Sequence, residues 1–276
     1  MGRRTSHVAR RTSHIARRTS HVARRTYNPA VQVYTAAVGL SVLGSLGGLL
    51  VASAFLLLGD GLRSRIVPWA ISYAVGTLLG VALLALLPEA LETLPPTTAL
   101  GTLLGGVLTF FMLEKLVLWR HCHDGEGHEC AAHTSSAASL VVIGDAFHTF
   151  VDGAIIAAAV VTSIPLGVTT ALAVAAHEIP QEVGDVAILL RAGYSRAQAL
   201  TLNIMSGIGG ILGAIGMLVA SQTIPQALPH ILAFAAGNFL YIAMADLIPD
   251  LHRGNTQGAF RQMALIGAGL LTIVML

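Results

Sequence analysis

Long apolar stretches follow one another along the chain from Val33 onward, separated by short polar breaks. Each stretch is long enough to cross about 30 Å of hydrocarbon as a helix. The breaks carry glycine, proline or charged residues, which are typical of turns between helices. We therefore predict an all-α integral membrane protein with eight transmembrane helices. Their approximate spans are 33–58, 68–91, 97–119, 137–163, 166–191, 196–220, 227–250 and 258–276.

The amino-acid composition agrees with this pattern. Of the 276 residues, 54% are hydrophobic and only 11% are charged, whereas a soluble globular chain carries about 25% charged residues. This composition excludes a nucleic-acid-binding module, a disulfide scaffold and an ordinary cytosolic enzyme. Transporters, channels, intramembrane enzymes and passive membrane scaffolds remain. We expect the lipid bilayer to be a partner and nucleic acid not to be one.

The first residues of the chain repeat an arginine-rich heptapeptide, RRTSHVA or RRTSHIA. The repeat has no apolar stripe wide enough to pack against another helix. We therefore predict that residues 1–26 form a disordered extension and that residues 27–276 form a single eight-helix transporter domain. The alternative for the extension is a basic arm that touches anionic lipid.

Basic residues in the connections predict the orientation, because loops that stay in the cytoplasm are enriched in lysine and arginine. The connections after the first, third, fifth and seventh predicted helices, together with the helix ends beside them, carry such residues, and the other connections carry none. They are Arg63, Arg65, Lys115, Arg120, Arg191, Arg196, Arg253 and Arg261. We expect a multi-pass protein of the cell (inner) membrane with both termini extracytoplasmic. The arginine-rich extension opposes this orientation, because it would place many arginines outside. We follow the interior connections, because all four that carry basic residues indicate the same orientation.

An internal repeat links the two ends of the predicted bundle. Residues 73–91 match residues 234–252 without a gap, residues 47–50 match residues 209–212, and residues 106–113 match residues 269–276. Helices one to three thus echo helices six to eight in a 3+2+3 arrangement. Five helices separate the partners, so the two copies would be inverted in the membrane, as in many secondary transporters. Chance similarity between glycine- and leucine-rich helices is the alternative.

The two middle helices hold most of the ionisable residues that a bilayer should reject, and such residues are usually functional. Helical spacing puts the residues of each helix on one face or on two adjacent stripes. They are Asp145, His148 and Asp152 in the fourth helix, and His177, Glu178, Gln181, Glu182 and Asp185 in the fifth. Imidazoles and carboxylates that face each other across two helices suit Zn²⁺, Fe²⁺, Mn²⁺ or Cd²⁺.

Other readings of this cluster are open. The groups could pair with one another to hold the bundle together, but the two helices offer no basic partner before Arg191. The sequence from His177 to Gln181 differs from the HExxH motif of zinc metalloproteases only at its last residue, so an intramembrane protease is an alternative. However, Gln181 replaces the second histidine, and Pro180 would bend the helix, so we expect no enzyme. A metal-sensing membrane receptor is a further alternative.

The motifs of these helices resemble those of the ZIP family of zinc and iron permeases. HTFVDG at 148–153 is similar to the family's HNxxDG motif, and HEIPQEVGD at 177–185 is similar to its HExPxExGD motif. Asn203 and Ser206 with the following glycine resemble NxxSG in the sixth helix. The resemblance covers essentially the whole chain from the first helix. It implies transport of a divalent metal toward the cytosol, commonly by a homodimer, with helices one, four, five and six moving against the rest.

The resemblance also assigns ligands. It places His148, His177 and Gln181 at first-site positions and Asp152 and Glu178 at or near a second, bridged site. With the acids that share these faces, the candidate metal ligands are His148, Asp152, His177, Glu178, Gln181, Asn203, Glu182 and Asp145. Zn²⁺ is expected as the transported substrate, with Fe²⁺, Mn²⁺ or Cd²⁺ as alternatives, and no resident cofactor is expected.

The chain departs from the family pattern at three positions and carries one unusual loop. Thr149 replaces the usual asparagine, Gly210 replaces a glutamate of some relatives, and Gln181 stands in place of a histidine or glutamate. The cytoplasmic loop at 120–136 is rich in histidine and cysteine and is expected to catch or sense metal. A solvated polar linker is the alternative.

Overall fold

The computed structural model describes residues 29–56, 60–122, 131–252 and 258–276, and these residues form helices and no β-strand. The predicted all-α class is confirmed. The described residues from Ala36 to Leu276 belong to one compact unit. The predicted extension at residues 1–26 lies outside the described residues, and its boundary stays a prediction.

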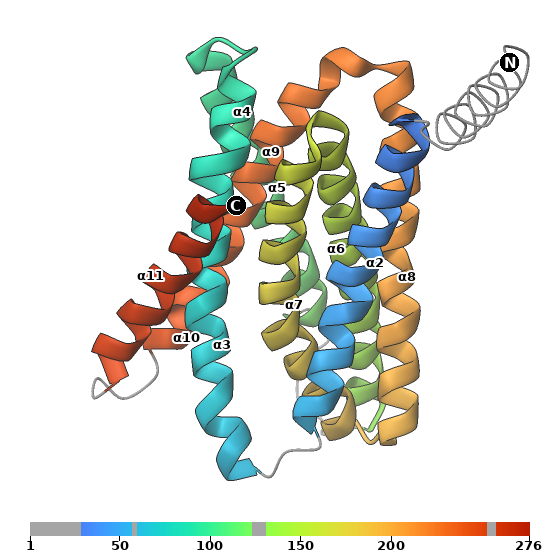
Figure 1. Ribbon diagram of the computed structural model, residues 1–276. Helices are drawn as coiled ribbons and strands as arrows, with labels where there is room; N and C mark the ends of the chain where they lie inside the picture. Colours follow the sequence, from blue (N-terminus) through green and yellow to red (C-terminus); the bar gives the residue numbers. More distant parts are fainter. Residues whose placement is uncertain (1–28, 57–59, 123–130, 253–257) are drawn as a thin grey trace, which may run out of the picture. The chain divides into compact units, whose positions relative to one another are not determined.

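The helices follow one another along the chain with short connections (Figure 1). Each of the eight predicted segments falls on one helix or on one continuous run of helices. In order they are α2 (Pro29–Leu56), α3 (Asp60–Gly80), η2 (Val81–Leu86), α4 (Leu87–Leu91), α5 (Pro96–Cys122), α6 (Ala131–Thr162), α7 (Ile164–Arg191), α8 (Arg196–Thr223), η3 (Pro225–Ala227), α9 (Leu228–Tyr241), η4 (Ile242–Leu247), α10 (Ile248–His252) and α11 (Ala259–Met275).

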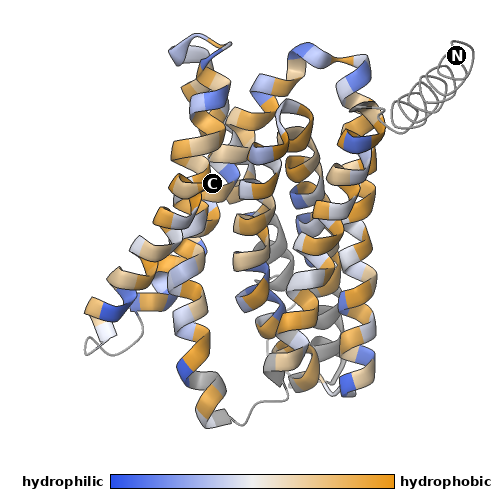
Figure 2. Ribbon diagram, viewed as in Figure 1, coloured by the Kyte–Doolittle hydropathy of each residue, from blue (hydrophilic) through white to orange (hydrophobic). Residues whose placement is uncertain are grey.

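Six stretches of the described chain are long and apolar enough to cross a membrane, which makes this a multi-pass integral membrane protein. They are Ala30–Val51, Arg65–Leu91, Pro96–Leu113, Val142–Thr162, Arg196–Thr223 and Pro225–His252. Apolar residues extend along these helices in Figure 2. Two predicted spans are not among the six, because α7 carries several charged residues and α11 has only 17 residues. A total of eight spans therefore stays a prediction.

The ends of α7 are fixed by local hydrogen bonds. At its start the Ser163 hydroxyl accepts a hydrogen bond from the Leu166 amide, as an N-cap residue does. At its end Gly193 has a φ of 91°, and the amides of Gly193 and Tyr194 donate to carbonyls of the last turn. This end is a Schellman motif, for which glycine is suited because it adopts positive φ without strain. The helix that carries HEIPQEVGD is thus delimited by its own sequence.

Glycines that the internal repeat matches make matching contacts. A Cβ atom on Gly76 of α3 would overlap the Ile266 carbonyl of α11, and a Cβ atom on Gly237 of α9 would overlap the Leu103 carbonyl of α5. Helix pairs α3/α11 and α9/α5 are therefore packed backbone to backbone at equivalent positions, as small residues allow in membrane proteins. An internal repeat predicts this correspondence. That the two copies are inverted stays a prediction.

Small residues also join α6 to α8, which lie side by side in Figure 1. A Cβ atom on Gly153 of α6 would overlap the Gly210 carbonyl of α8, and one on Gly213 of α8 would overlap the Phe150 carbonyl of α6. The Thr149 hydroxyl donates a hydrogen bond of 2.8 Å to the Ser206 carbonyl across the same interface. This tight contact holds the α6 site residues at a fixed distance from α8.

The connection between α5 and α6 is shorter than predicted. The loop was expected at residues 120–136, but α5 continues to Cys122 and α6 begins at Ala131. The remaining His- and Cys-rich residues, 123–130, lie outside the described residues, so their metal-catching role stays a prediction.

Candidate metal centre

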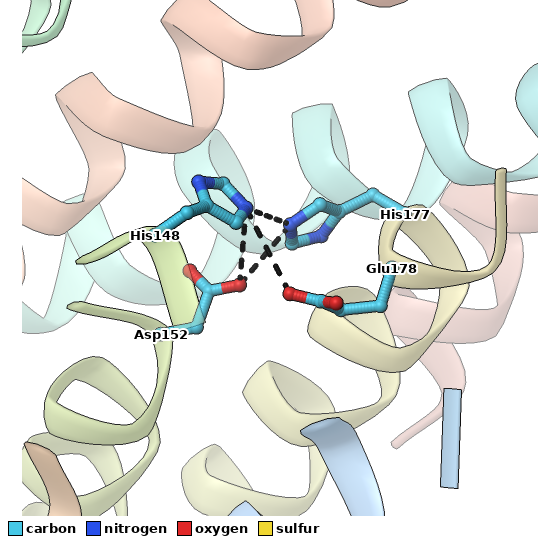
Figure 3. Close-up of side chains that lie close together, drawn as sticks. All are labelled: His148, Asp152, His177 and Glu178. Carbon is cyan, nitrogen blue, oxygen red and sulfur yellow. Dashed lines mark hydrogen bonds and ion pairs between the residues drawn. The ribbon is translucent and has the colours of Figure 1, made fainter. Parts of the chain in front are cut away.

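Two neighbouring helices bring four predicted ligands together (Figure 3). His148 and Asp152 lie one turn apart on α6, and His177 and Glu178 are adjacent on α7. The Nε2 atoms of the two histidines are 3.1 Å apart. Asp152 Oδ2 lies 3.5 Å from His148 Nε2 and 3.1 Å from His177 Nε2, and Glu178 Oε1 lies 3.8 Å from His148 Nε2. Two imidazole nitrogens and two carboxylate oxygens thus converge on one point.

The separations of these atoms are close to those of a zinc site. Zinc binds nitrogen and oxygen ligands at about 2.0–2.2 Å, so the ligand atoms of a tetrahedron lie about 3.3–3.6 Å from one another. The four separations given above run from 3.1 to 3.8 Å, and all four ligand atoms lie within 4.8 Å of one another.

His177 is held in the orientation that a ligand needs. Its Nδ1 atom lies 3.1 Å from the Ala173 carbonyl, one turn earlier on α7. Because a carbonyl oxygen can only accept, Nδ1 carries the hydrogen and donates a hydrogen bond to this carbonyl. The lone pair of Nε2 is then available to bind a metal. The ring also packs against Phe239 of α9, with ring centroids 6.0 Å apart at an interplanar angle of 61°. Contacts on both sides of the ring thus aim Nε2 at the cluster.

The cluster is buried and rich in negative charge. Asp152 and Glu178 are 0% exposed, and their four carboxylate oxygens accept no hydrogen bond from the described residues. Burying an ionised carboxylate without a partner is costly, because a low-dielectric interior cannot replace its hydration. A bound divalent cation would offset the charge of both acids at once. The donor set therefore fits a metal ion.

Comparison with known proteins agrees with this geometry. Residues 119–276 match the family model described as ZIP zinc transporter. The chain belongs to the ZIP zinc transporter family. It is 34% identical to zinc transporter ZIP13 of Pongo abelii over 79% of this chain and 70% of that protein. It is 30% identical to zinc transporter ZIP13 of Homo sapiens over 79% of this chain and 74% of the relative.

A shorter match extends to another member of the family. Zinc transporter ZIP10 of Danio rerio is 37% identical over 46% of this chain and 15% of its own length. The family prediction is confirmed. Assignment to the branch with the HExPxExGD motif stays a prediction.

The remaining predicted ligands of this ZIP chain lie next to the four-residue cluster. Asp145 and Glu182 form a second group with Glu178, with the ligand atoms of all three within 4.8 Å of one another. The Asn203 amide donates a hydrogen bond of 2.7 Å to Glu182 Oε2, so Asn203 contacts an acid of the second group. Gln181 is half-buried on α7, and its role as a ligand stays a prediction.

Two of the departures from the ZIP pattern, Thr149 and Gly210, lie at contacts between helices. The Thr149 hydroxyl lies within hydrogen-bond distance of backbone carbonyls of α6 and α8. A Cβ atom at position 210 would overlap the Ser45 hydroxyl of α2, so a longer side chain there would require Ser45 to move. Position 210 supplies no acid to a metal in this chain.

Two contacts of the site could not be predicted from the sequence. Phe239 packs against His177. Gly48 of α2 lies so close to Glu178 that a Cβ atom built on Gly48 would be 2.9 Å from the Cβ atom of Glu178. Both residues lie in segments matched by the internal repeat. A repeat shows that a position recurs, but it does not show which neighbouring helix that position faces.

Proposed function

We propose that this ZIP chain carries divalent metal ions, Zn²⁺ foremost, across the membrane through the cluster of His148, Asp152, His177 and Glu178. The observation that supports the proposal is the convergence of these four side chains, two imidazoles and two buried carboxylates, between α6 and α7. The names of the relatives agree, since ZIP13 and ZIP10 are zinc transporters. They favour transport over an intramembrane protease. Fe²⁺, Mn²⁺ and Cd²⁺ are further candidate substrates.

Charge balance explains how such a site could let an ion cross. A bare divalent cation is excluded from hydrocarbon by the loss of its hydration. Asp152 and Glu178 together carry the two negative charges that neutralise it, and the two imidazoles replace part of its water shell. The loaded site is then neutral overall. The four carboxylate oxygens accept no hydrogen bond from the described residues, so they are available to bind the ion.

Several properties belong to the proposal and go beyond the family assignment. We place both termini outside the cytoplasm of a cell (inner) membrane, because the basic connections alternate along the chain. Movement of the metal toward the cytosol and assembly as a homodimer follow from the resemblance to the family. Gln181 and Asn203 are proposed as additional polar groups at the site.

Flux through purified protein in liposomes tests the proposal. The protein is reconstituted with a metal-sensitive dye inside the vesicles, and a panel of divalent metals is added outside. We expect Zn²⁺ entry with the parent chain and nearly none with His148→Ala or His177→Ala. His230→Ala is the matched control, because His230 is exposed at the start of α9 and should leave flux unchanged. If His177→Ala transports like the parent, the path does not use this cluster.

A further inference from the structure

In the part of the chain that the structure describes, two helix runs each contain a six-residue π-helix. The first, η2, covers Val81–Leu86 between α3 and α4, and the second, η4, covers Ile242–Leu247 between α9 and α10. The repeat that matches residues 73–91 to residues 234–252 aligns the two segments residue for residue. A π-helix is rare and frequently marks a functional position. Its recurrence indicates that this break in the α-helix is a property of the repeat.

A proline explains the position of each π-helix. Pro88 follows the last residue of η2 by two positions, and Pro249 follows the last residue of η4 by two positions. Proline has no amide N–H, and inside an α-helix its ring collides with the carbonyl four positions earlier. The wider turn of a π-helix before the proline relieves this collision.

The hydrogen bonds of the two segments correspond as well. The Leu87 amide donates to the Ala82 carbonyl, five positions back, and the Ile248 amide donates to the Ala243 carbonyl in the same way. The next carbonyl along each segment thus loses the amide four positions ahead, and the residue five positions ahead is the proline. With fewer backbone hydrogen bonds, each segment can change its geometry more readily than the α-helix on either side.

Both π-helices adjoin the surroundings of the metal centre. η2 contacts α9 and α7, and α7 is the helix that carries His177 and Glu178. η4 contacts α3, and it begins three residues after Phe239, whose ring packs against His177. A change of geometry in either segment therefore reaches the neighbours of the metal ligands.

We propose that η2 and η4 are a pair of hinges, held in π-helical form by Pro88 and Pro249, at which the helix runs 60–91 and 225–252 bend during transport. The inference rests on the proposed function, because a hinge serves the movement of the metal and not its binding. Both runs belong to the helices against which the others are expected to move. Bending lets them stay in contact with α6 and α7 while those helices shift.

The repeat also gives the two hinges different parts in the cycle. In the inverted arrangement that the repeat predicts, one hinge lies in each half of the membrane. Alternating access opens the site to one side and then to the other. One hinge then bends at the outward-open step and the other at the inward-open step, so each is needed for a complete cycle.

Replacement of each proline by alanine in the full-length chain tests this inference. Pro88→Ala and Pro249→Ala supply the missing N–H and remove the collision, so each segment should become α-helical. Hydrogen exchange of peptides that cover 81–86 and 242–247 checks this change, because a continuous α-helix protects its amides better. We expect each variant to lower the maximal Zn²⁺ flux in liposomes by on the order of tenfold.

Affinity and stability distinguish a hinge from a purely structural proline. The Zn²⁺ Kd should stay within about twofold of the parent, because no ligand is changed. The apparent Tm should equal or exceed that of the parent, because proline is unfavourable inside a helix. A proline that only shapes the helix would give the same rise in Tm with unaltered flux. Pro96→Ala is the matched control, because Pro96 is the first residue of α5, where its missing N–H costs no hydrogen bond.

The outcomes separate this inference from the proposed function. If both variants gain protection in the substituted segment and transport like the parent, the hinges are overturned and the proposed function stands. Unchanged hydrogen exchange in both variants also overturns them, because the prolines then do not set the π-helices. If one variant fails to fold, the other provides the same test. A parent that neither binds nor transports Zn²⁺ contradicts the proposed function itself.

Discussion

Gln181 is the residue at which this site departs most from a strong zinc site. It follows His177 by one turn of α7 and is half-buried, so a ligand there would be a neutral amide oxygen. An imidazole binds zinc more firmly than an amide oxygen does. We therefore expect Gln181→His to tighten Zn²⁺ binding. Turnover should stay level or fall, because an ion that is held more firmly leaves more slowly. Titration calorimetry and liposome flux measure the two effects.

The control for this substitution is Gln226→His, which introduces the same side chain at an exposed position of η3. It should change neither affinity nor turnover. If Gln181→His leaves the affinity of the parent unaltered, the side chain at 181 does not reach the metal, and the cluster of four described residues binds it alone.

The histidines also predict how binding depends on pH. Metal coordination needs the unprotonated Nε2 atoms of His148 and His177, so protons and metal compete for the same lone pairs. Zn²⁺ affinity should therefore fall as the pH is lowered from about 7.5 to about 5.5, with uptake of protons as the metal leaves. Calorimetry in buffers of different ionisation enthalpy measures both quantities. Affinity that stayed flat over this range would exclude the histidines as ligands.

At the scale of helices, the position of the site depends on how closely α6 and α8 approach. Gly213 has no space for a side chain, because a Cβ atom there would overlap the Phe150 carbonyl. A clash with backbone cannot be relieved by rotating a side chain. We expect Gly213→Ala to destabilise the fold by on the order of 3 kcal/mol, seen as a lower apparent Tm in detergent and a lower abundance in membranes.

Gly216 on the same helix gives the matched control. No atom lies within 4 Å of a Cβ built at this position, so Gly216→Ala meets open space and also favours helix formation. Its Tm should equal or slightly exceed that of the parent. Equal destabilisation by both substitutions would mean that the effect arises from helix propensity and that the α6–α8 contact is not its cause.

Much of the helical architecture could be predicted from the sequence, because its signals are local. Apolar length defines the spans, and spacing of three or four residues puts His148 and Asp152 on one face of α6. The contacts between elements could not be predicted in this way. Neither the packing of Phe239 against His177 nor the hydrogen bond from Asn203 to Glu182 has a local signal. Both depend on which helices become neighbours in the folded chain.

At the scale of the whole molecule, the charges and the repeat lead to one expectation. Basic residues occur after every second predicted helix, and glycines matched by the repeat make equivalent contacts in α3/α11 and in α9/α5. If the two halves are inverted, equivalent helices run in opposite directions across the membrane. The side on which each helix end emerges is therefore the quantity to measure.

Helix α8 offers a direct measurement of that side. It spans 28 residues, which corresponds to about 40 Å at 1.5 Å per residue, so its two ends emerge on opposite sides. Cys122 and Cys130 are first replaced by serine, and Arg196→Cys and Ser221→Cys are then labelled separately. We expect Arg196→Cys to react only from the cytoplasmic side and Ser221→Cys only from outside. Labelling of Ser221→Cys from the cytoplasmic side would contradict both the orientation and the inverted repeat.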